Sequence, residues 1–150
     1  MKQITKKKVI KEDKRRQKKQ KENKKEKEDR TLESQSKIYD LEERTALFAE
    51  AVRDFCLKLP KNAANAEYVP QLMRSGSSPG ANYIEANESI GEKDFLMKIK
   101  TCRRESKESA YWLRLVITDG STEQESKRIY LRQEAKEFIL IFTAILKKRA

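Results

Sequence analysis

Polar and charged side chains recur at helical spacing in the second half of the chain, and these residues are the candidates for chemistry. Side chains three or four residues apart lie on one face of a helix, so each set forms a band beside the apolar positions of its helix. The first band consists of Gln71, Arg74, Ser78, Asn82 and Glu85, and the second consists of Thr101, Glu105, Glu108 and Trp112.

Two half-buried polar bands on successive helices are expected to meet, with Arg74 paired to Glu105 or Glu108. We favour a hydrogen-bonded ion-pair network that fixes the register of the helices or a contact between subunits. The alternative is a carboxylate cluster for acid/base chemistry or for a hard cation, built from Glu85, Glu105 and Glu108. Di-iron sites in helical bundles need histidine ligands, and the chain has no histidine. We therefore expect neither a metal nor a cofactor.

The side-chain combinations of other common catalytic sites are also missing from the sequence. Without histidine there is no Cys–His or Ser–His pair, and the two cysteines lack the spacing of a metal site. The Gly-Ser-Ser-Pro-Gly run at residues 76–80 is not followed by the Lys-Ser/Thr of a phosphate-binding loop. These absences favour a protein that is not an enzyme and that acts by binding.

A third stripe of the same region is basic. It lies roughly 100–180° around the predicted helix from the apolar positions, so it faces solvent. Most runs of charge are solvated surface, but cations lined up along one helix also suit a polyanion such as RNA or DNA. The stripe repeats every seven residues at Lys93, Lys100, Lys107 and Arg114, and Arg103 and Arg104 flank it.

The N-terminal segment strengthens the nucleic-acid interpretation. Residues 1–37 hold 16 Lys or Arg and 7 Asp or Glu, a net charge of +9, so residues 38–150 carry only +2 of the total of +11. The segment has too few apolar residues to bury a core, while its Lys, Glu and Gln content permits helix. We expect a basic arm, either disordered or a single helix. An anionic membrane is a weaker partner, because aromatic anchors are lacking.

Four amphipathic helices are predicted after the arm, over about residues 40–59, 62–89, 92–118 and from 121 onward. Pro70 and the run at 76–80 are expected to kink or interrupt the second helix. Short connections favour antiparallel neighbours, so the predicted fold is all-α, an antiparallel up-down four-helix bundle at residues 38–150. The predicted core positions are Leu41, Phe48, Val52, Phe55 and Leu59; Tyr68, Leu72, Tyr83, Ala86 and Ile90; Phe95, Ile99, Cys102, Leu113 and Val116; and Ile129, Ala135, Phe138, Phe142 and Ile145.

The cysteines and the apolar runs predict a cytoplasmic protein. Cys56 and Cys102 fall beside apolar positions and are expected to be buried free thiols in a reducing cytosol. The N-terminus has no apolar core of a signal peptide. The longest apolar stretch, residues 138–146, is about half of the ~20 residues that cross a bilayer. We therefore expect no membrane partner.

The segment from Gln71 to Asn87 resembles the second-helix signature of the bacterial four helix bundle proteins, also called 23S rRNA intervening-sequence proteins. The similarity covers about residues 38–148 and excludes the arm. Two departures are that Pro79 replaces an apolar residue of the signature and that the domain is only weakly basic. The similarity continues through Asp94-Phe95, Lys98-Ile99, Cys102-Arg103 and Glu105-x-x-Glu108-x-x-Tyr111-Trp112-Leu113.

This resemblance implies an assembly and a partner that the residue spacing does not predict. Genes of the family often lie inside intervening sequences of 23S rRNA genes. A related branch, the accessory variability protein of diversity-generating retroelements, is a basic five-subunit barrel that binds nucleic acid and its reverse transcriptase. The leading hypothesis is thus a homo-oligomer, a pentamer, that binds RNA or DNA. One alternative is an adaptor that docks a protein such as a reverse transcriptase. A nuclease is disfavoured, because histidine is absent.

Overall fold

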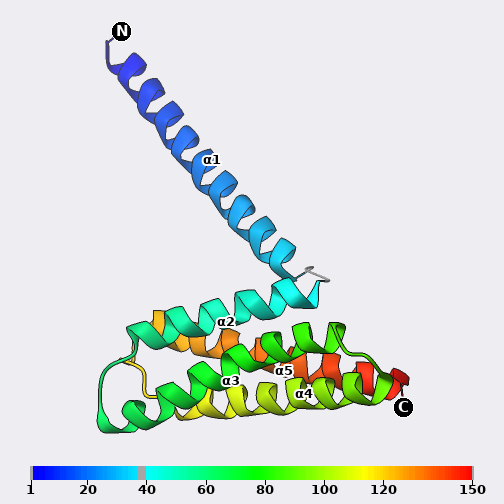
Figure 1. The fold of residues 1–150 in the computed structure, drawn as a ribbon. Coiled ribbons are helices and arrows are strands. Elements are labelled where there is room, and N and C mark those ends of the chain that lie inside the picture. Colours follow the sequence, from blue (N-terminus) through cyan, green and yellow to red (C-terminus); the bar gives the residue numbers. More distant parts are fainter. Residues whose placement is uncertain (1, 37–39, 150) are drawn as a thin grey trace. The chain divides into compact units, whose positions relative to one another are not determined.

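The computed structural model describes residues 2–36 and 40–149, and the side chains of residues 5–26 and 40–149. Within these ranges it contains five α-helices and no strand, which confirms the predicted all-α class. The chain divides into two compact units, Met1–Tyr39 and Asp40–Ala150, and each is described by itself. The helices are α1 (Lys2–Ser36), α2 (Leu41–Lys58), α3 (Ala63–Asn87), α4 (Glu92–Leu115) and α5 (Thr122–Arg149) (Figure 1).

Helix α1 has no apolar face. The described side chains between residues 5 and 26 are all exposed, including Val9 and Ile10, which are 53% and 55% accessible. An ion pair of 3.9 Å joins Lys18 to Glu22, one turn apart. A helix that is polar all round gains little from packing and is maintained by its own propensity and by such pairs. The predicted arm ends at residue 37, which lies outside the described residues.

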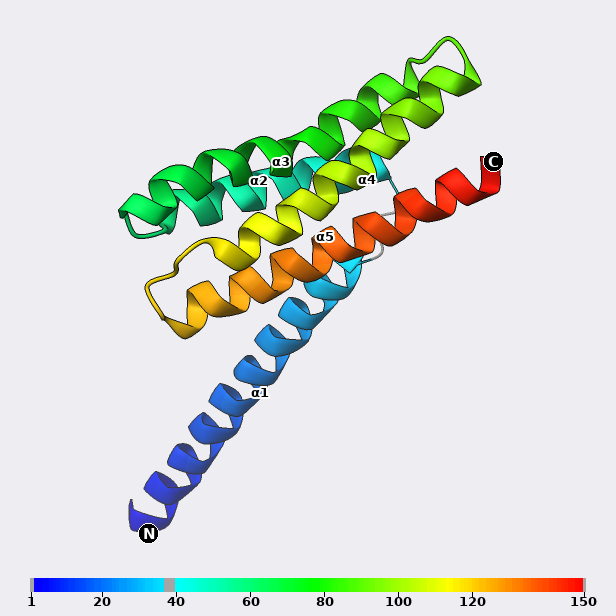
Figure 2. The ribbon, with the colours of Figure 1, turned by 90° about the horizontal axis from the view of Figure 1, so that it is seen from below.

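Helices α2 to α5 form the second unit by packing side by side (Figure 2). Helix α3 contacts α2 and α4, and α5 contacts α4 and, less extensively, α2. Phe138 lies at the centre, where its ring meets Phe48 edge-on at 5.3 Å and Phe142 in a stacked arrangement at 6.2 Å. The largest fully buried apolar side chains are those of Phe138, Phe142, Leu72, Ile99, Leu113, Leu131, Val52 and Val116.

Two predicted core residues are exposed instead. Ile90 is fully accessible because α3 ends at Asn87, so this side chain belongs to the connection and not to the helix. Ile129 is 66% accessible, and Leu131 takes the core position. Residues two apart on a helix differ by about 200°, so Ile129 must face away from the core when Leu131 faces toward it.

Helix α3 is continuous through Pro70 and Pro79, and the predicted interruption is not found. The glycines explain how α3 packs there. A Cβ at Gly76 would lie 2.8 Å from Val52 Cγ1, and one at Gly80 would lie 3.1 Å from Thr45 Oγ1. The glycines, with no side chains, therefore allow α2 and α3 to approach closely. Packing on both sides of this segment maintains the helix although each proline lacks an N–H donor.

The connections at one end of the domain are held by two side-chain amides. Asn65 Nδ2 donates to the carbonyl oxygens of Pro60 (2.7 Å) and Ile117 (2.9 Å), and its Oδ1 accepts from the Ile117 N–H (2.8 Å). Gln124 Nε2 donates to Lys58 O (2.8 Å). The α2–α3 connection and the segment that follows α4 are therefore tied together by side chains of α3 and α5.

Two helix boundaries follow from local chemistry. Asp40 precedes α2 as predicted, and its Oδ1 accepts from the Glu42 N–H at 3.0 Å, as an N-cap does. Helix α4 ends at Leu115, three residues earlier than predicted, because Val116 is extended (ψ 143°). None of the described helices combines the length and apolar character that a bilayer span requires.

Candidate nucleic-acid interface on helix α4

Helix α4 lies between α3 and α5 and presents one face to each neighbour and a third to solvent. Small polar side chains on the packed side bond to their own helix: Ser106 Oγ donates to Cys102 O (2.8 Å) and Ser109 Oγ to Glu105 O (2.9 Å). Both serines are fully buried. With their hydroxyls satisfied locally, they act as small spacers that allow the neighbouring helices to come close. The buried side of α4 consists of Ile99, Cys102, Glu105, Ser106, Ser109 and Leu113.

The outward side of α4 carries the predicted basic stripe. Its five exposed members are Lys93, Lys100, Arg104, Lys107 and Arg114. Among these, Arg104 approaches Glu105 at 3.7 Å, and the other four side chains have no ion pair or hydrogen bond within the described part of the chain. Unpaired cations keep their full charge available to a ligand. The sixth predicted residue, Arg103, is half-buried, unlike the other five, and lies at the edge of the stripe.

Three acidic residues of α4 are engaged by arginines of the neighbouring helices. Glu92 accepts a hydrogen bond from Arg149 of α5 at 3.0 Å, while Glu105 and Glu108 face α3. Asp94 lies in the first turn, about 100° around the helix from Lys93. Glu108 lies four residues after Arg104 and is 38% accessible, but its charge is paired with Arg74, so it weakens the field of the stripe toward a polyanion less than an unpaired carboxylate would.

Tyr111 belongs to the same outward surface, although it is not among the binding residues predicted from the sequence. Its side chain is 54% accessible, and its ring packs edge-on against Trp112 at a centroid distance of 5.0 Å. It lies four residues after Lys107 and seven after Arg104, which places it on their face of the helix. An exposed ring among cations can stack on a base while the cations contact phosphates. This helical spacing was the signal that could have found it.

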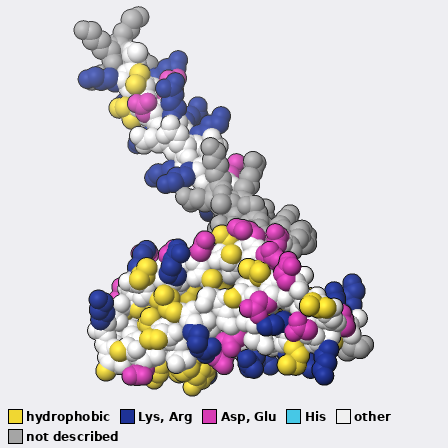
Figure 3. Space-filling view, in the orientation of Figure 1, with side chains coloured by type: hydrophobic (Ala, Val, Ile, Leu, Met, Phe, Trp, Pro, Cys, Tyr) yellow, Lys and Arg dark blue, Asp and Glu magenta, His cyan; other side chains and the backbone are white. Residues whose placement is uncertain are grey.

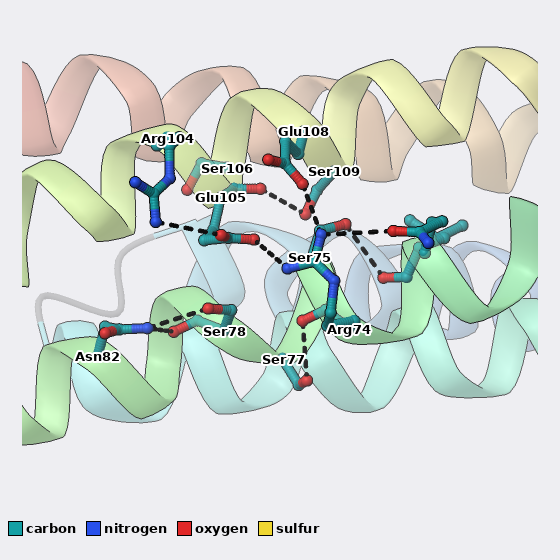
Figure 4. Close-up of polar contacts among 12 residues, drawn as sticks. Arg74, Ser75, Ser77, Ser78, Asn82, Arg104, Glu105, Ser106, Glu108 and Ser109 are labelled. Carbon is teal, nitrogen blue, oxygen red and sulfur yellow. Dashed lines mark hydrogen bonds and ion pairs between the residues drawn. The ribbon is translucent and has the colours of Figure 1, made fainter.

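A polar cluster joins α4 to α3 on the next face (Figure 4). Arg74 Nη1 donates to Glu105 Oε2 at 3.1 Å, and its Nη2 donates to Glu108 Oε2 at 2.7 Å. The same Nη2 lies 3.5 Å from Gln71 Oε1. The structure thus brings together four of the residues predicted as one network.

The cluster is buried on its carboxylate side only. The side chain of Glu105 is 7% accessible, whereas those of Arg74 and Glu108 are 53% and 38% accessible. The hydrogen bond to Glu108, followed by the field of both carboxylates, raises the pKa of Arg74 above its ordinary value, against the desolvation that lowers it. The predicted half-buried band is accurate for Glu105, while the guanidinium remains at the surface.

The other members of the predicted network are separate from this cluster. Asn82 Nδ2 donates to Ser78 Oγ at 3.0 Å and to Ser78 O at 2.9 Å, so these two residues pair within α3. Glu85 pairs with Lys98 of α4. The predicted residues thus form three separate groups along the α3–α4 contact and not one network, because each carboxylate or amide bonds to a nearer partner.

The arrangement leaves no set of ligands for a metal. Glu85 is engaged by Lys98, and Arg74 holds Glu105 and Glu108. In the described residues, no group of three or more His, Cys, Asp or Glu could hold an ion. Both cysteines are free and buried, and burial raises the pKa of each thiol to about 12.

Comparison with known proteins gives a structural relative. No protein-family model matches the chain, and no curated protein matches it. A crystal structure of a protein of unknown function from the S23 ribosomal protein family of Bacteroides thetaiotaomicron VPI-5482 superposes with a TM-score of 0.62 at 25% sequence identity. The chain resembles that protein. The match covers 72% of this chain and 99% of the relative. The likeness is consistent with the 23S rRNA intervening-sequence resemblance of the sequence.

Proposed function

We propose that the protein is a non-enzymatic homo-oligomer that binds RNA or DNA through the outward face of α4 and the basic arm. The observation that carries the proposal is the composition of that face: exposed Lys93, Lys100, Lys107 and Arg114 without ion-pair partners among the described residues, next to an exposed Tyr111. Cations at this spacing neutralise phosphates and release counterions, which supplies affinity without sequence preference. The ring adds stacking, which every base can accept.

The proposal includes an up-down antiparallel four-helix bundle behind an arm formed by residues 1–37. Bonds between helix ends support this topology. Asn87 at the end of α3 donates to Glu42 at the start of α2 (2.8 Å), and Arg149 at the end of α5 donates to Glu92 at the start of α4 (3.0 Å). Membership of the 23S rRNA intervening-sequence family is supported by the S23 family relative at 25% identity. The pentamer is what the family resemblance of the sequence implies.

A protein adaptor is the second candidate function, and exposed apolar side chains favour it. Leu57, Met97 and Leu140 are each at least 60% accessible. They lie on three helices, α2, α4 and α5, where each offers an apolar contact to a protein partner, although single exposed apolar residues are also normal on a surface. The two candidates make different demands on α4, because an adaptor does not need its cations.

The proposal is tested by measuring the affinity of labelled single-stranded RNA and duplex DNA for the full chain over a range of salt concentrations. Reversal of Lys100, Lys107 and Arg114 to Glu should weaken binding at low salt at least tenfold. On single strands it should flatten the log–log salt slope by about 2, at ~0.7 per lost phosphate contact. Tyr111→Ala should weaken binding about 5- to 100-fold through lost stacking.

Matched controls carry the same charge change elsewhere. Lys58, Lys61 and Lys148 are exposed and lie outside α4, so their reversal to Glu alters the net charge equally. Tyr130→Ala removes another exposed tyrosine, on α5. If the control triple weakens binding as much as the α4 triple, binding depends on overall charge and the α4 interface is wrong. If the wild-type chain binds neither single-stranded RNA nor duplex DNA at low salt, the nucleic-acid proposal is wrong and the protein adaptor replaces it.

A further inference from the structure

The outward face of α2 combines exposed leucines with carboxylates. Leu47 and Leu57 are 38% and 74% accessible, and Glu43, Glu50 and Asp54 occupy the same strip of the helix. Arg53, which pairs with Asp54 at 3.1 Å, and Lys58, four residues after Asp54, lie at the two edges of this strip, and Glu43 and Glu50 are its carboxylates without an ion pair among the described residues. Figure 3 shows hydrophobic and acidic side chains exposed beside one another over α2. We call the two leucines and the three carboxylates the acidic face.

The outward face of α5 has the opposite charge and the same apolar content. Ile129 and Leu140 are 66% and 64% accessible, and the exposed Lys136 and Lys147 share their side of the helix. Gln133 lies between them and donates to Glu137 at 3.1 Å, and Glu125, four residues before Ile129, is paired with Arg128 at 3.2 Å. We call the two apolar residues, the two lysines and Gln133 the basic face.

The apolar positions of the two faces have matching separations. At about 1.5 Å per residue, Leu47 and Leu57 are ~15 Å apart along α2, and Ile129 and Leu140 are ~16.5 Å apart along α5. Two helices placed antiparallel through these faces bring Leu47 next to Leu140 and Leu57 next to Ile129.

The same antiparallel register also pairs the charges. Glu50 then lies opposite Lys136, and Glu43 lies within one turn of Lys147. Within the described residues none of these four side chains has a hydrogen bond or an ion pair. In the single chain, no described ion pair therefore neutralises the charges of these four side chains. Asp54 differs, because Arg53 pairs with it at 3.1 Å.

The two faces of one copy cannot meet, because α2 and α5 of the same copy already contact through their inward sides. Arg44 of α2 bonds to Glu134 of α5 at 2.6 Å, and Phe48 packs on Phe138. The outward faces point away from that contact. Their occupant must come from another molecule, and a surface that matches both in charge and spacing is present on every copy of this chain.

We propose that the acidic face of one copy binds the basic face of the next, so that copies join head to tail. This inference rests on the oligomeric part of the proposed function and names the surfaces that build it. Because the two faces differ, each copy engages two neighbours, and repetition gives a ring or an open chain and not a two-fold dimer. The α4 stripe is not used in this contact.

Charge reversal and re-pairing test the interface in the full chain, with mass measured by light scattering. The acidic-face variant (Glu43→Lys, Glu50→Lys) and the basic-face variant (Lys136→Glu, Lys147→Glu) should each raise the concentration for half-assembly at least about tenfold. Combining all four changes in one chain restores opposite charges across every contact and should recover the wild-type assembly. Mixing the two variants restores opposite charges only between unlike copies, so it should restore association, but a ring with an odd number of copies would keep one like-charge contact.

The control variant, Glu67→Lys in α3 with Glu88→Lys at the C-cap of that helix, makes the same charge change as the acidic-face variant at exposed positions and should assemble like wild type. If the wild-type chain assembles and both face variants assemble equally well, the head-to-tail surfaces are wrong, while the oligomeric function stands. If the wild-type chain remains at its monomer mass of 17.6 kDa, both the interface and the oligomer are wrong. Nucleic-acid affinity can still be measured on that monomer. Failure of the combined variant to recover assembly would also overturn the pairing.

Discussion

Glu105 places a carboxylate inside the domain, and its partners determine whether that is tolerable. Burial of an ionised carboxylate is unfavourable unless hydrogen-bond donors compensate for the lost water. Arg74 supplies one donor to Oε2 at 3.1 Å, and Arg104 lies 3.7 Å from Oε1. The guanidinium of Arg74 also bonds Glu108, so one side chain of α3 connects two successive turns of α4.

Arg74→Ala should lower the free energy of unfolding by about 1–3 kcal/mol, because it removes the donor from buried Glu105. The loss should be smaller than the ~3–5 kcal/mol of a fully buried pair, since the guanidinium is half-exposed and water and Arg104 replace part of the interaction. Urea denaturation measures this value. Gln71→Ala, which removes an exposed neighbour at 3.5 Å, should change stability by less than about 0.5 kcal/mol. An Arg74→Ala value within that range would mean that the cluster does not stabilise the α3–α4 contact.

At the residue scale, helix periodicity predicts which side chains share a face but not which partner each one chooses. Arg74 contacts Glu105 and Glu108, as the regular helical spacing of the polar residues on both helices predicted. Asn82 instead bonds to Ser78, four residues earlier on its own helix. Helical spacing alone does not decide between that partner and one on α4. Tyr111 was missed for another reason: an aromatic residue beside Trp112 suggests core until the burial of its neighbours is known.

Helix α3 depends on residues that usually end helices. Two prolines and two glycines lie inside it, and its contact with α2 passes directly over the glycines. The sequence alone favours an interruption at this segment, because the propensities of Pro and Gly oppose helix. Packing against Val52 and Thr45 reverses that preference, and such long-range contacts are not visible in a local pattern. The helices without internal Pro or Gly runs were predicted within a few residues.

Gly76→Ala should destabilise the domain by about 1–3 kcal/mol, although alanine is the better helix former. The added Cβ would come within 2.8 Å of Val52 Cγ1, a branched buried side chain that cannot move away without disturbing the core. Thermal or urea unfolding of the variant measures the effect.

Gly91→Ala is the matched control, because nothing lies within 4 Å of the added carbon there. Gly91 is the N-cap of α4, where Ala is less favourable than Gly, so the change in the free energy of unfolding should stay below about 1 kcal/mol. Equal effects of the two substitutions would show that α2 and α3 do not approach as closely as the structure has them.

At the scale of the whole molecule, charge and stability are assigned to different units. The domain from Asp40 contains the core, while residues 1–37 supply +9 of the net charge of +11. The described side chains of α1, those of residues 5–26, are all exposed, so they bury no apolar surface on folding.

Deletion of residues 1–39 should therefore leave the midpoint of thermal unfolding within about 2 °C of the full chain, and should flatten the salt dependence of RNA binding. Each lost phosphate contact removes ~0.7 from the log–log slope on single strands. Replacing α1 by a Gly/Ser segment of equal length separates charge from chain length and should behave as the deletion does. Equal slopes with and without α1 would mean that the arm takes no part in binding.

The length of α1 also sets the distance between a ligand bound near the N-terminus of the arm and the C-terminal end of that helix. A helix of 35 residues measures about 52 Å from end to end at 1.5 Å per residue. A nucleic-acid strand bound near Lys6 would therefore be connected to the other end of α1 by a rigid helix. The ends of a flexible coil of the same number of residues would on average lie closer together. Under the proposed function, several copies in one assembly would bind one long strand at separate points, and avidity, more than the strength of any single contact, would then govern how long the strand remains bound.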